Sequence, residues 1–312
     1  MSAAPAEART GVIAAVAAYT MWGFFPLYFL ALREVAAIEL VLERVIFAVP
    51  VGLAIVLWRG QGAEVVAGLR SPRVLGVLAL TALFIAANWL IYILAVQNGQ
   101  IFQASLGYYI NPLVYVLVGV VVLGERLSRG QAAAVGVASL GVAVLTIGGG
   151  AFPWIAFALA ISFTVYGYLR KVVAIGAMPG LFIETAILLP FASLGLVALV
   201  RTQGAAIDGA GPGLLAALAF AGPATVLPLL FFAIAARRLT LATLGFLQFI
   251  GPSLQFVIGL LDGEPFTRAH AVCFACIWLA AALFAADAWR RTHAPAREAA
   301  EAPAETPVPA ER

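Results

Sequence analysis

Charged residues are scarce in this chain of 312 residues: Asp, Glu, Lys and Arg make up 11% of it, whereas a soluble domain carries about 25%. Apolar residues make up 63%, and the mean hydropathy is +1.04. Most of the surface therefore cannot face water, which excludes a soluble globular domain and predicts an integral membrane protein. The small net charge of +3 gives no reason to expect a nucleic-acid partner.

Cysteines and catalytic motifs are also few. The two cysteines, Cys273 and Cys276, exclude a disulfide framework, and because they lie in an apolar stretch we interpret them, with His270, as packing residues. The chain has no G-x-x-x-x-G-K-[ST], G-x-G-x-x-G, H-E-x-x-H or G-x-S-x-G motif and no aspartate-rich motif for Mg-diphosphate. We therefore predict no enzyme, no catalytic residue, no metal and no cofactor.

Long apolar runs are abundant. A spanning helix needs about 20 largely apolar residues, and we expect ten such helices, at residues 11–31, 36–58, 74–96, 102–123, 131–149, 152–169, 178–200, 213–236, 241–261 and 269–289. Residues 292–312 are rich in Ala, Pro and Glu and lack apolar periodicity, so we interpret them as a disordered cytoplasmic tail.

The basic residues predict the orientation of these spans. If the N-terminus is cytoplasmic, fourteen Lys and Arg residues fall in inner loops and tails, whereas only Arg33, Arg201 and Arg268 fall in outer loops. Cytoplasmic loops of membrane proteins carry this excess. We therefore predict a multi-pass protein of the inner (plasma) membrane with both termini in the cytoplasm.

An internal repeat links the two halves of the chain. Residues 104–125 match 242–264 through Ala, Leu, Gly, Pro and Gly-Glu in the same order, with Pro112 opposite Pro252. The repeat joins the fourth span to the ninth, and an odd displacement inverts the second copy in the membrane. Inverted repeats with interrupted helices at matched positions are typical of secondary transporters. We predict an all-α fold of two inverted five-helix repeats, residues 11–150 and 151–291, after a cytoplasmic N-terminus at 1–10.

Polar and aromatic side chains at membrane depth indicate a substrate cavity. Matched prolines at mid-span kink helices and free backbone carbonyls, and polar faces lie beside both of them. We predict helix kinks at Pro112 and Pro252. The predicted substrate-binding residues are Trp22, Trp89, Tyr92, Tyr108, Asn111, Gln248 and Gln255. Hydrogen bonding between helices is the structural alternative for each of them.

Charges inside the spans need a reason, because each costs about 2.5–3.5 kcal/mol on insertion scales. Glu39 and Glu43 share a helix face, and Arg44 follows them. They are candidates for coupling or gating, with a structural ion pair as the alternative. We interpret Glu184, near the start of the 178–200 span, as structural.

Motifs over residues 10–291 resemble the RarD group of the EamA-type drug/metabolite transporters. They include Trp22-Gly23, Asn88-Trp89-Leu90, Ala104-Ser105-Leu106-Gly107-Tyr108, Ile110-Asn111-Pro112-Leu113, Ile183-Glu184-Thr185, Pro228-Leu229-Leu230 and Ile250-Gly251-Pro252. The resemblance implies a ten-helix inner-membrane carrier that exports metabolites or drugs. The family pattern usually has His where this chain has Glu43.

We therefore predict a secondary active transporter that works by alternating access. Its expected partners are a small-molecule substrate, the lipid bilayer and protons as a candidate coupling ion. Two alternatives stay open at this point: a membrane-embedded enzyme acting on a lipid-linked substrate, and a non-transporting membrane sensor subunit. Substrate identity and oligomeric state do not follow from the sequence.

Overall fold

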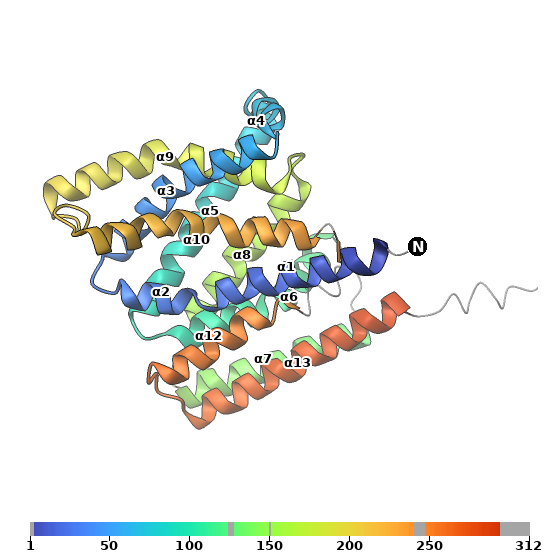
Figure 1. The fold of residues 1–312 in the computed structure, drawn as a ribbon. Coiled ribbons are helices and arrows are strands. Elements are labelled where there is room, and N and C mark those ends of the chain that lie inside the picture. The colour runs from blue at the N-terminus through green and yellow to red at the C-terminus, as the bar shows by residue number, and fades with distance from the viewer. Residues whose placement is uncertain (1–2, 124–127, 150, 237, 240–246, 294–312) are drawn as a thin grey trace, which may run out of the picture.

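The structure is a computed structural model that describes residues 3–123, 128–149, 151–236, 238–239 and 247–293. Every regular element in these ranges is an α-helix (Figure 1). The helices are α1 (Ala3–Gly23), α2 (Phe25–Ala31), α3 (Ala37–Trp58), α4 (Gly62–Leu69), α5 (Pro72–Gln97), α6 (Ile101–Leu123), α7 (Arg129–Gly149), α8 (Trp154–Val172), α9 (Ala177–Thr202), α10 (Pro212–Ala236), α12 (Ile250–Leu261) and α13 (Arg268–His293). The predicted tail from residue 294 onward lies outside the described residues.

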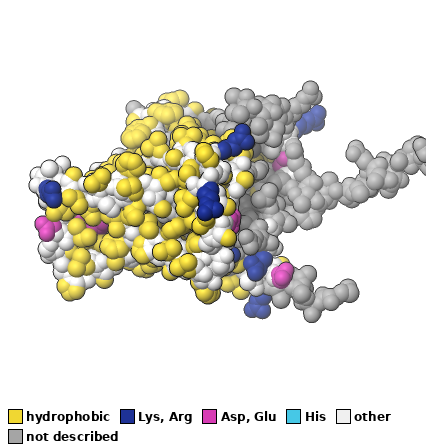
Figure 2. Space-filling model, turned by 90° about the horizontal axis from the view of Figure 1, so that it is seen from above, with side chains coloured by type: hydrophobic (Ala, Val, Ile, Leu, Met, Phe, Trp, Pro, Cys, Tyr) yellow, Lys and Arg dark blue, Asp and Glu magenta, His cyan; other side chains and the backbone are white. Residues whose placement is uncertain are grey.

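Seven helices among the described residues are long and apolar enough to cross a membrane: α1 with α2 (Glu7–Ala31), α3, α5, α7, α9, α10 and α13. Trp154–Arg170 and Ile250–Leu261 are shorter apolar helices. Figure 2 shows hydrophobic side chains across the middle of the visible face, with charged side chains toward its two ends. The prediction of a multi-pass, all-helical membrane protein is confirmed, and the count of ten spans stays a prediction.

The ninth predicted span, 241–261, is not one continuous helix. Residues 240–246 lie outside the described residues, the chain turns at Gln248 and Phe249, and α12 begins at Ile250. Because Pro252 has no N–H, the Gln248 carbonyl lacks its ordinary helical donor, and the Gly251 N–H bonds it at 3.3 Å instead. The proline therefore lies in the first turn of α12, where its missing N–H is tolerated.

The two halves of the chain pack mainly on each other. α1 packs on α10 and α12, while α8 packs on α5 and α6; α3 packs on α9 and α10, and α9 also packs on α5. α7 pairs with α13, and α6 with α12. The start of α1 and the end of α13 lie at the same end of the bundle (Figure 1).

Two features outside the spanning helices were not predicted from the sequence. The short helix α4 lies between α3 and α5, and its Gly68 leaves room for Ile175 and Ile183. At the opposite end, Glu264 follows α12 and accepts a hydrogen bond of 2.9 Å from the Phe102 N–H in the first turn of α6. Burial raises the pKa of the Glu264 carboxyl from 4.5 to about 7.

Candidate functional site

Arg44 lies in an aromatic environment in the interior of the helix bundle. It occupies the eighth position of α3 and is 5% exposed. Its guanidinium carbon Cζ lies 4.1 Å from the ring centroid of Trp89 in α5 and 5.2 Å from that of Phe25 in α2. Such cation–π contacts contribute about 0.5–2 kcal/mol each. They offset only part of the cost of burying a charge.

The remaining contact of Arg44 is a hydrogen bond of 2.7 Å from Nε to the hydroxyl of Thr225 in α10. Among the described residues, neither Glu39 nor Glu43 forms an ion pair with it. The structural ion pair considered from the sequence is therefore absent from this part of the chain. The cation is held by rings and one hydroxyl group instead.

Tyr92 and Tyr108 extend this aromatic environment, with 5.8 Å between their ring centroids. The Tyr108 hydroxyl bonds Asn88 Oδ1 at 3.4 Å, and Asn88 Nδ2 donates to the Ser162 hydroxyl in α8 at 2.9 Å. α5, α6 and α8 are thus joined by polar side chains. Trp89, Tyr92 and Tyr108, predicted separately to bind substrate, lie close to one another and to Arg44.

Several buried polar atoms in the bundle have no hydrogen-bond partner among the described residues. They include both carboxylate oxygens of Glu43, the Tyr92 hydroxyl, both amide atoms of Asn111 and Oε1 of Gln255. A buried polar group without a partner costs about 1–3 kcal/mol, and such groups are rare in native proteins. Glu39 differs, because its Oε1 accepts a hydrogen bond of 3.0 Å from the Ile207 N–H in the loop before α10.

Trp22 and Gln255, two further predicted residues, lie where α1 meets α12. The helix is interrupted between α1 and α2, because Pro26 has no N–H to donate to the Trp22 carbonyl. Gln255 Nε2 donates to that carbonyl instead, at 3.2 Å. The rings of Trp22, Tyr19 and Phe232 pack against one another. Gln248 lies in the turn before α12, and Pro112 lies within α6, but its side chain is outside the described residues.

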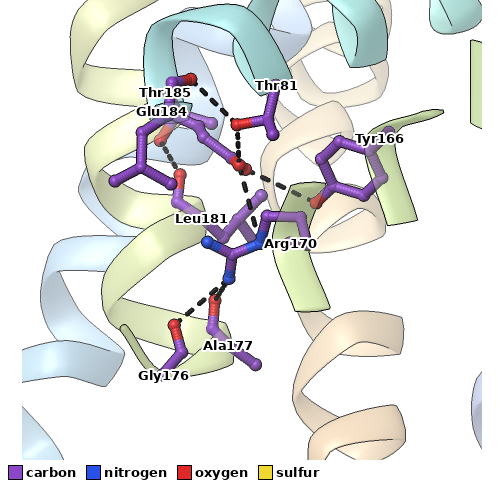
Figure 3. Close-up of polar contacts among 9 residues, drawn as sticks. Thr81, Tyr166, Arg170, Gly176, Ala177, Leu181, Glu184 and Thr185 are labelled. Atoms are coloured by element: carbon purple, nitrogen blue, oxygen red, sulfur yellow. Dashed lines mark hydrogen bonds and ion pairs between the residues drawn. The ribbon is translucent and has the colours of Figure 1, made fainter. Parts of the chain in front are cut away.

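A second polar cluster surrounds Glu184 at the eighth position of α9 (Figure 3). Glu184 Oε1 accepts a hydrogen bond of 2.6 Å from Thr81 in α5 and lies 3.6 Å from Arg170 Nε in α8. The Tyr166 hydroxyl donates to Oε2 at 3.4 Å. Arg170 reaches past Gly180, where a Cβ atom would collide with its Nη1.

The other guanidinium nitrogen, Nη2, donates to the carbonyls of Gly176 and Ala177 (Figure 3). Arg170 therefore forms a largely buried ion pair with Glu184, whereas from the sequence it is only one of the fourteen basic residues assigned to inner loops and tails. Glu184 has partners in α5 and α8, and its structural role stays a prediction. The Arg170 contact depends on the turn after α8, which no sequence spacing indicates.

Neither of two cavities in the structure contains the predicted residues. One, of about 410 Å³, lies between α6, α7 and the start of α8 and is lined mainly by apolar side chains such as Ile110 and Val142. The other, of about 640 Å³, lies near Trp58, Arg59 and Arg238. Trp89, Asn111 and Arg44 are instead buried in the interior of the bundle.

Sequence reasoning missed Phe25 and Thr225, which contact Arg44, and Ser162, which contacts Asn88. Thr225 carried a usable signal, since it is the one polar side chain between residues 212 and 236. A lone polar residue in an otherwise apolar spanning helix needs a partner. Phe25 carried no such signal, because aromatic residues are frequent throughout this chain.

Comparison with known proteins identifies relatives over nearly the whole chain. Residues 9–147 match the family described as "EamA-like transporter family". An "Uncharacterized transporter" of Vibrio cholerae is 43% identical over 293 residues, which cover 93% of this chain and 97% of that protein. "Protein RarD" of Streptomyces exfoliatus is 42% identical and covers 97% of both chains. "Protein RarD" of Escherichia coli is 40% identical over 90% of this chain and 96% of its own.

A solved crystal structure has the same fold. It aligns with a TM-score of 0.58 and covers 88% of this chain and 96% of its own, at 23% sequence identity. At that identity the likeness concerns the fold alone.

Proposed function

This chain belongs to the EamA-like transporter family, in its RarD group, and on that basis we propose that it exports small metabolites or drugs across the inner membrane by alternating access. It is a multi-pass membrane transporter. The proposal adds the direction of transport, the mechanism and the orientation, with both termini in the cytoplasm.

The observation that carries the proposal is the set of buried polar atoms without partners. Glu43, Tyr92 and Asn111 come from three different helices, α3, α5 and α6. Their unmet hydrogen-bonding capacity is costly in a membrane-embedded bundle. A polar substrate would satisfy it, and the closed packing around these residues corresponds to a state before the substrate enters.

The packing of the helices supports two inverted repeats. Each helix of the first half has a counterpart five spans later: α8 for α1, α10 for α5 and α12 for α6. When every helix is replaced by its counterpart, the contact of α1 with α10 becomes that of α8 with α5. The contacts of α1 with α12 and of α8 with α6 exchange in the same way. Halves related by such a pseudo-two-fold axis can rock against each other around a central site.

Individual residues follow the same relation. Arg44 and Glu184 both occupy the eighth position of their helices, α3 and α9, and each bonds a threonine hydroxyl from the partner helix. The Thr225 hydroxyl in α10 accepts a hydrogen bond from Arg44, and the Thr81 hydroxyl in α5 donates one to Glu184. In an inverted arrangement, one charge lies toward the outer face and the other toward the cytoplasm.

Protons are the candidate coupling ion, with Glu43 as the carboxylate that takes part. Glu39, on the same helix, is engaged by the Ile207 N–H, whereas Glu43 has no partner among the described residues. A carboxylate without fixed partners can gain or lose a proton as its surroundings open to water.

Thiol accessibility tests the alternating-access mechanism. With Cys273 and Cys276 replaced by Ala, we expect Asn111→Cys to react with a membrane-impermeant reagent from either face of sealed vesicles, because the site opens to each side in turn. Ala134→Cys, equally buried between α7 and α13, is the matched control and should stay unreactive. Reaction of Asn111→Cys from one face only, or from neither, contradicts alternating access.

A further inference from the structure

We propose that Arg44 is the anion-binding group of the transport site and that the substrate is an organic carboxylate with an aromatic or apolar body. This inference rests on the proposed function, because it names the substrate class of the same site. It follows from the ring contacts of the guanidinium and from which of its N–H groups have an acceptor among the described residues.

Two aromatic rings contact the guanidinium. Trp89 and Phe25 contribute rings at 4.1 and 5.2 Å from Cζ. A cation held over rings keeps its charge, since the rings offer no acceptor in the plane of the N–H groups. These two contacts therefore orient Arg44 without neutralising it.

Only one of the guanidinium nitrogens, Nε, donates a hydrogen bond to a described residue. Nε donates to Thr225, and no described residue accepts a hydrogen bond from the two terminal nitrogens. The described ion pairs belong to other residues: Arg33 with Glu34, and Arg170 with Glu184. A planar fork of N–H donors matches the two oxygens of a carboxylate, which binds it through parallel hydrogen bonds.

A second donor lies nearby. The Tyr92 hydroxyl is buried and has no hydrogen-bond partner in the part of the chain that the structure describes. Tyr92, Tyr28 and Tyr108 are all close enough to Arg44 to interact with it electrostatically. The Tyr28 hydroxyl is already engaged by the Ala217 carbonyl, and that of Tyr108 by Asn88. Tyr92 is thus the hydroxyl group that is free to donate to a bound carboxylate.

The surrounding side chains indicate the rest of the ligand. Phe29 packs on Tyr92, and Phe163 packs on Tyr108, so aromatic rings continue on both sides of the predicted anion position. Flat or apolar groups pack favourably on such rings. A carboxylate with an aromatic or apolar body fits this arrangement better than a neutral polar compound.

Matched acid and amide pairs test the inference, with the full chain in lipid nanodiscs. The probes are 3-phenylpropionate, indole-3-propionate and hexanoate, each with its carboxamide, and the readout is the equilibrium dissociation constant. We expect the wild-type protein to bind at least one acid about tenfold or more tightly than its amide, because only the acid forms charge-assisted hydrogen bonds. Arg44→Gln should abolish the preference by weakening the acid alone.

Two further variants keep the test decisive if Arg44→Gln folds poorly. Arg44→Lys keeps the charge but loses the fork and should lose most of the preference. Tyr92→Phe keeps the ring and removes only the hydroxyl, so it should weaken the acid severalfold and leave the amide unchanged. Arg33→Gln, at an exposed surface pair, is the matched control and should bind as the wild type does.

Equal binding of every acid and its amide overturns the inference, as does a preference that survives in Arg44→Gln. Flux in proteoliposomes separates this failure from failure of the proposed function. Transport of an amide by the wild type and Arg44→Gln alike would keep the transporter and reject the anion site. Arg44-dependent binding of an acid without flux of any probe would keep the anion site and reject transport.

Discussion

The guanidinium of Arg44 lies over the indole of Trp89, with 4.1 Å between Cζ and the ring centroid. This contact joins α3 to α5 in the interior of the bundle. We expect a double-mutant cycle of Arg44→Met and Trp89→Leu to give a coupling free energy of about 0.5–2 kcal/mol. Reversible unfolding in mixed detergent micelles measures it. The same cycle with exposed Arg33→Met should give no coupling, and zero coupling for Arg44 as well would contradict the contact.

Gln255 substitutes for the N–H that Pro26 lacks. Gln255→Ala leaves the part-buried Trp22 carbonyl without this donor, so we expect a loss of about 1 kcal/mol in the free energy of unfolding. Pro26→Ala restores a backbone donor at that carbonyl, so the loss from Gln255→Ala should shrink in the Pro26→Ala background. Gln203→Ala, at an exposed position, is the control. An equal loss in both backgrounds would refute this role of Gln255.

The buried pair of Arg170 and Glu184 should respond differently to single and double substitution. Glu184→Met leaves the Arg170 charge without its partner, and breaking a buried pair from one side costs about 3–5 kcal/mol. Replacing both residues by Met removes the uncompensated charge, so the double variant should be more stable than Glu184→Met. Thermal unfolding of both variants measures this. A double variant less stable than Glu184→Met would show that the unpaired Arg170 charge does not cause the loss of stability.

Stability should depend on pH through Glu264, whose pKa burial raises from 4.5 to about 7. The folded carboxyl binds its proton more tightly than the unfolded one. Its contribution to the unfolding free energy is therefore complete below about pH 4.5 and is lost as the pH rises through 7. Glu264→Gln should show a smaller fall in melting temperature between pH 5 and 8, whereas exposed Glu34→Gln should keep the wild-type fall. An unchanged fall in Glu264→Gln would exclude this assignment.

The helices and their turns could be predicted because apolar runs and glycines signal them directly. Residues 98–100 separate α5 from α6 as expected, and Gly99 has the positive φ of 65° that favours glycine. An interruption was predicted at Pro252, and the chain turns just before it, at Gln248 and Phe249. The position of the turn was not predicted, since a proline in an apolar run does not show whether it lies at mid-helix or in the first turn. The position of α4 was missed because a short amphipathic segment in a loop has little length on which periodicity can act.

The candidate site was predictable in its residue types and only partly in its contacts. Trp89, Tyr92 and Tyr108 were chosen as candidates because aromatic residues with hydroxyl and amide neighbours stand out in apolar helices. Their meeting with Arg44 depends on the packing of α3 against α5, which no local spacing encodes. The Arg44 contact with Thr225 joins residues 181 apart in sequence, and such long-range contacts follow only from the fold.

Proton-driven flux in proteoliposomes tests the central claim most directly. The panel is an amino acid, a nucleobase, an amphenicol and the aromatic acids named above, under an imposed proton gradient. We expect at least one compound to be transported against its own gradient, with the dependence on the proton gradient lost in Glu43→Gln and kept in Glu34→Gln. Absence of flux for every compound, with the protein folded and inserted, would contradict the assignment as a secondary active exporter.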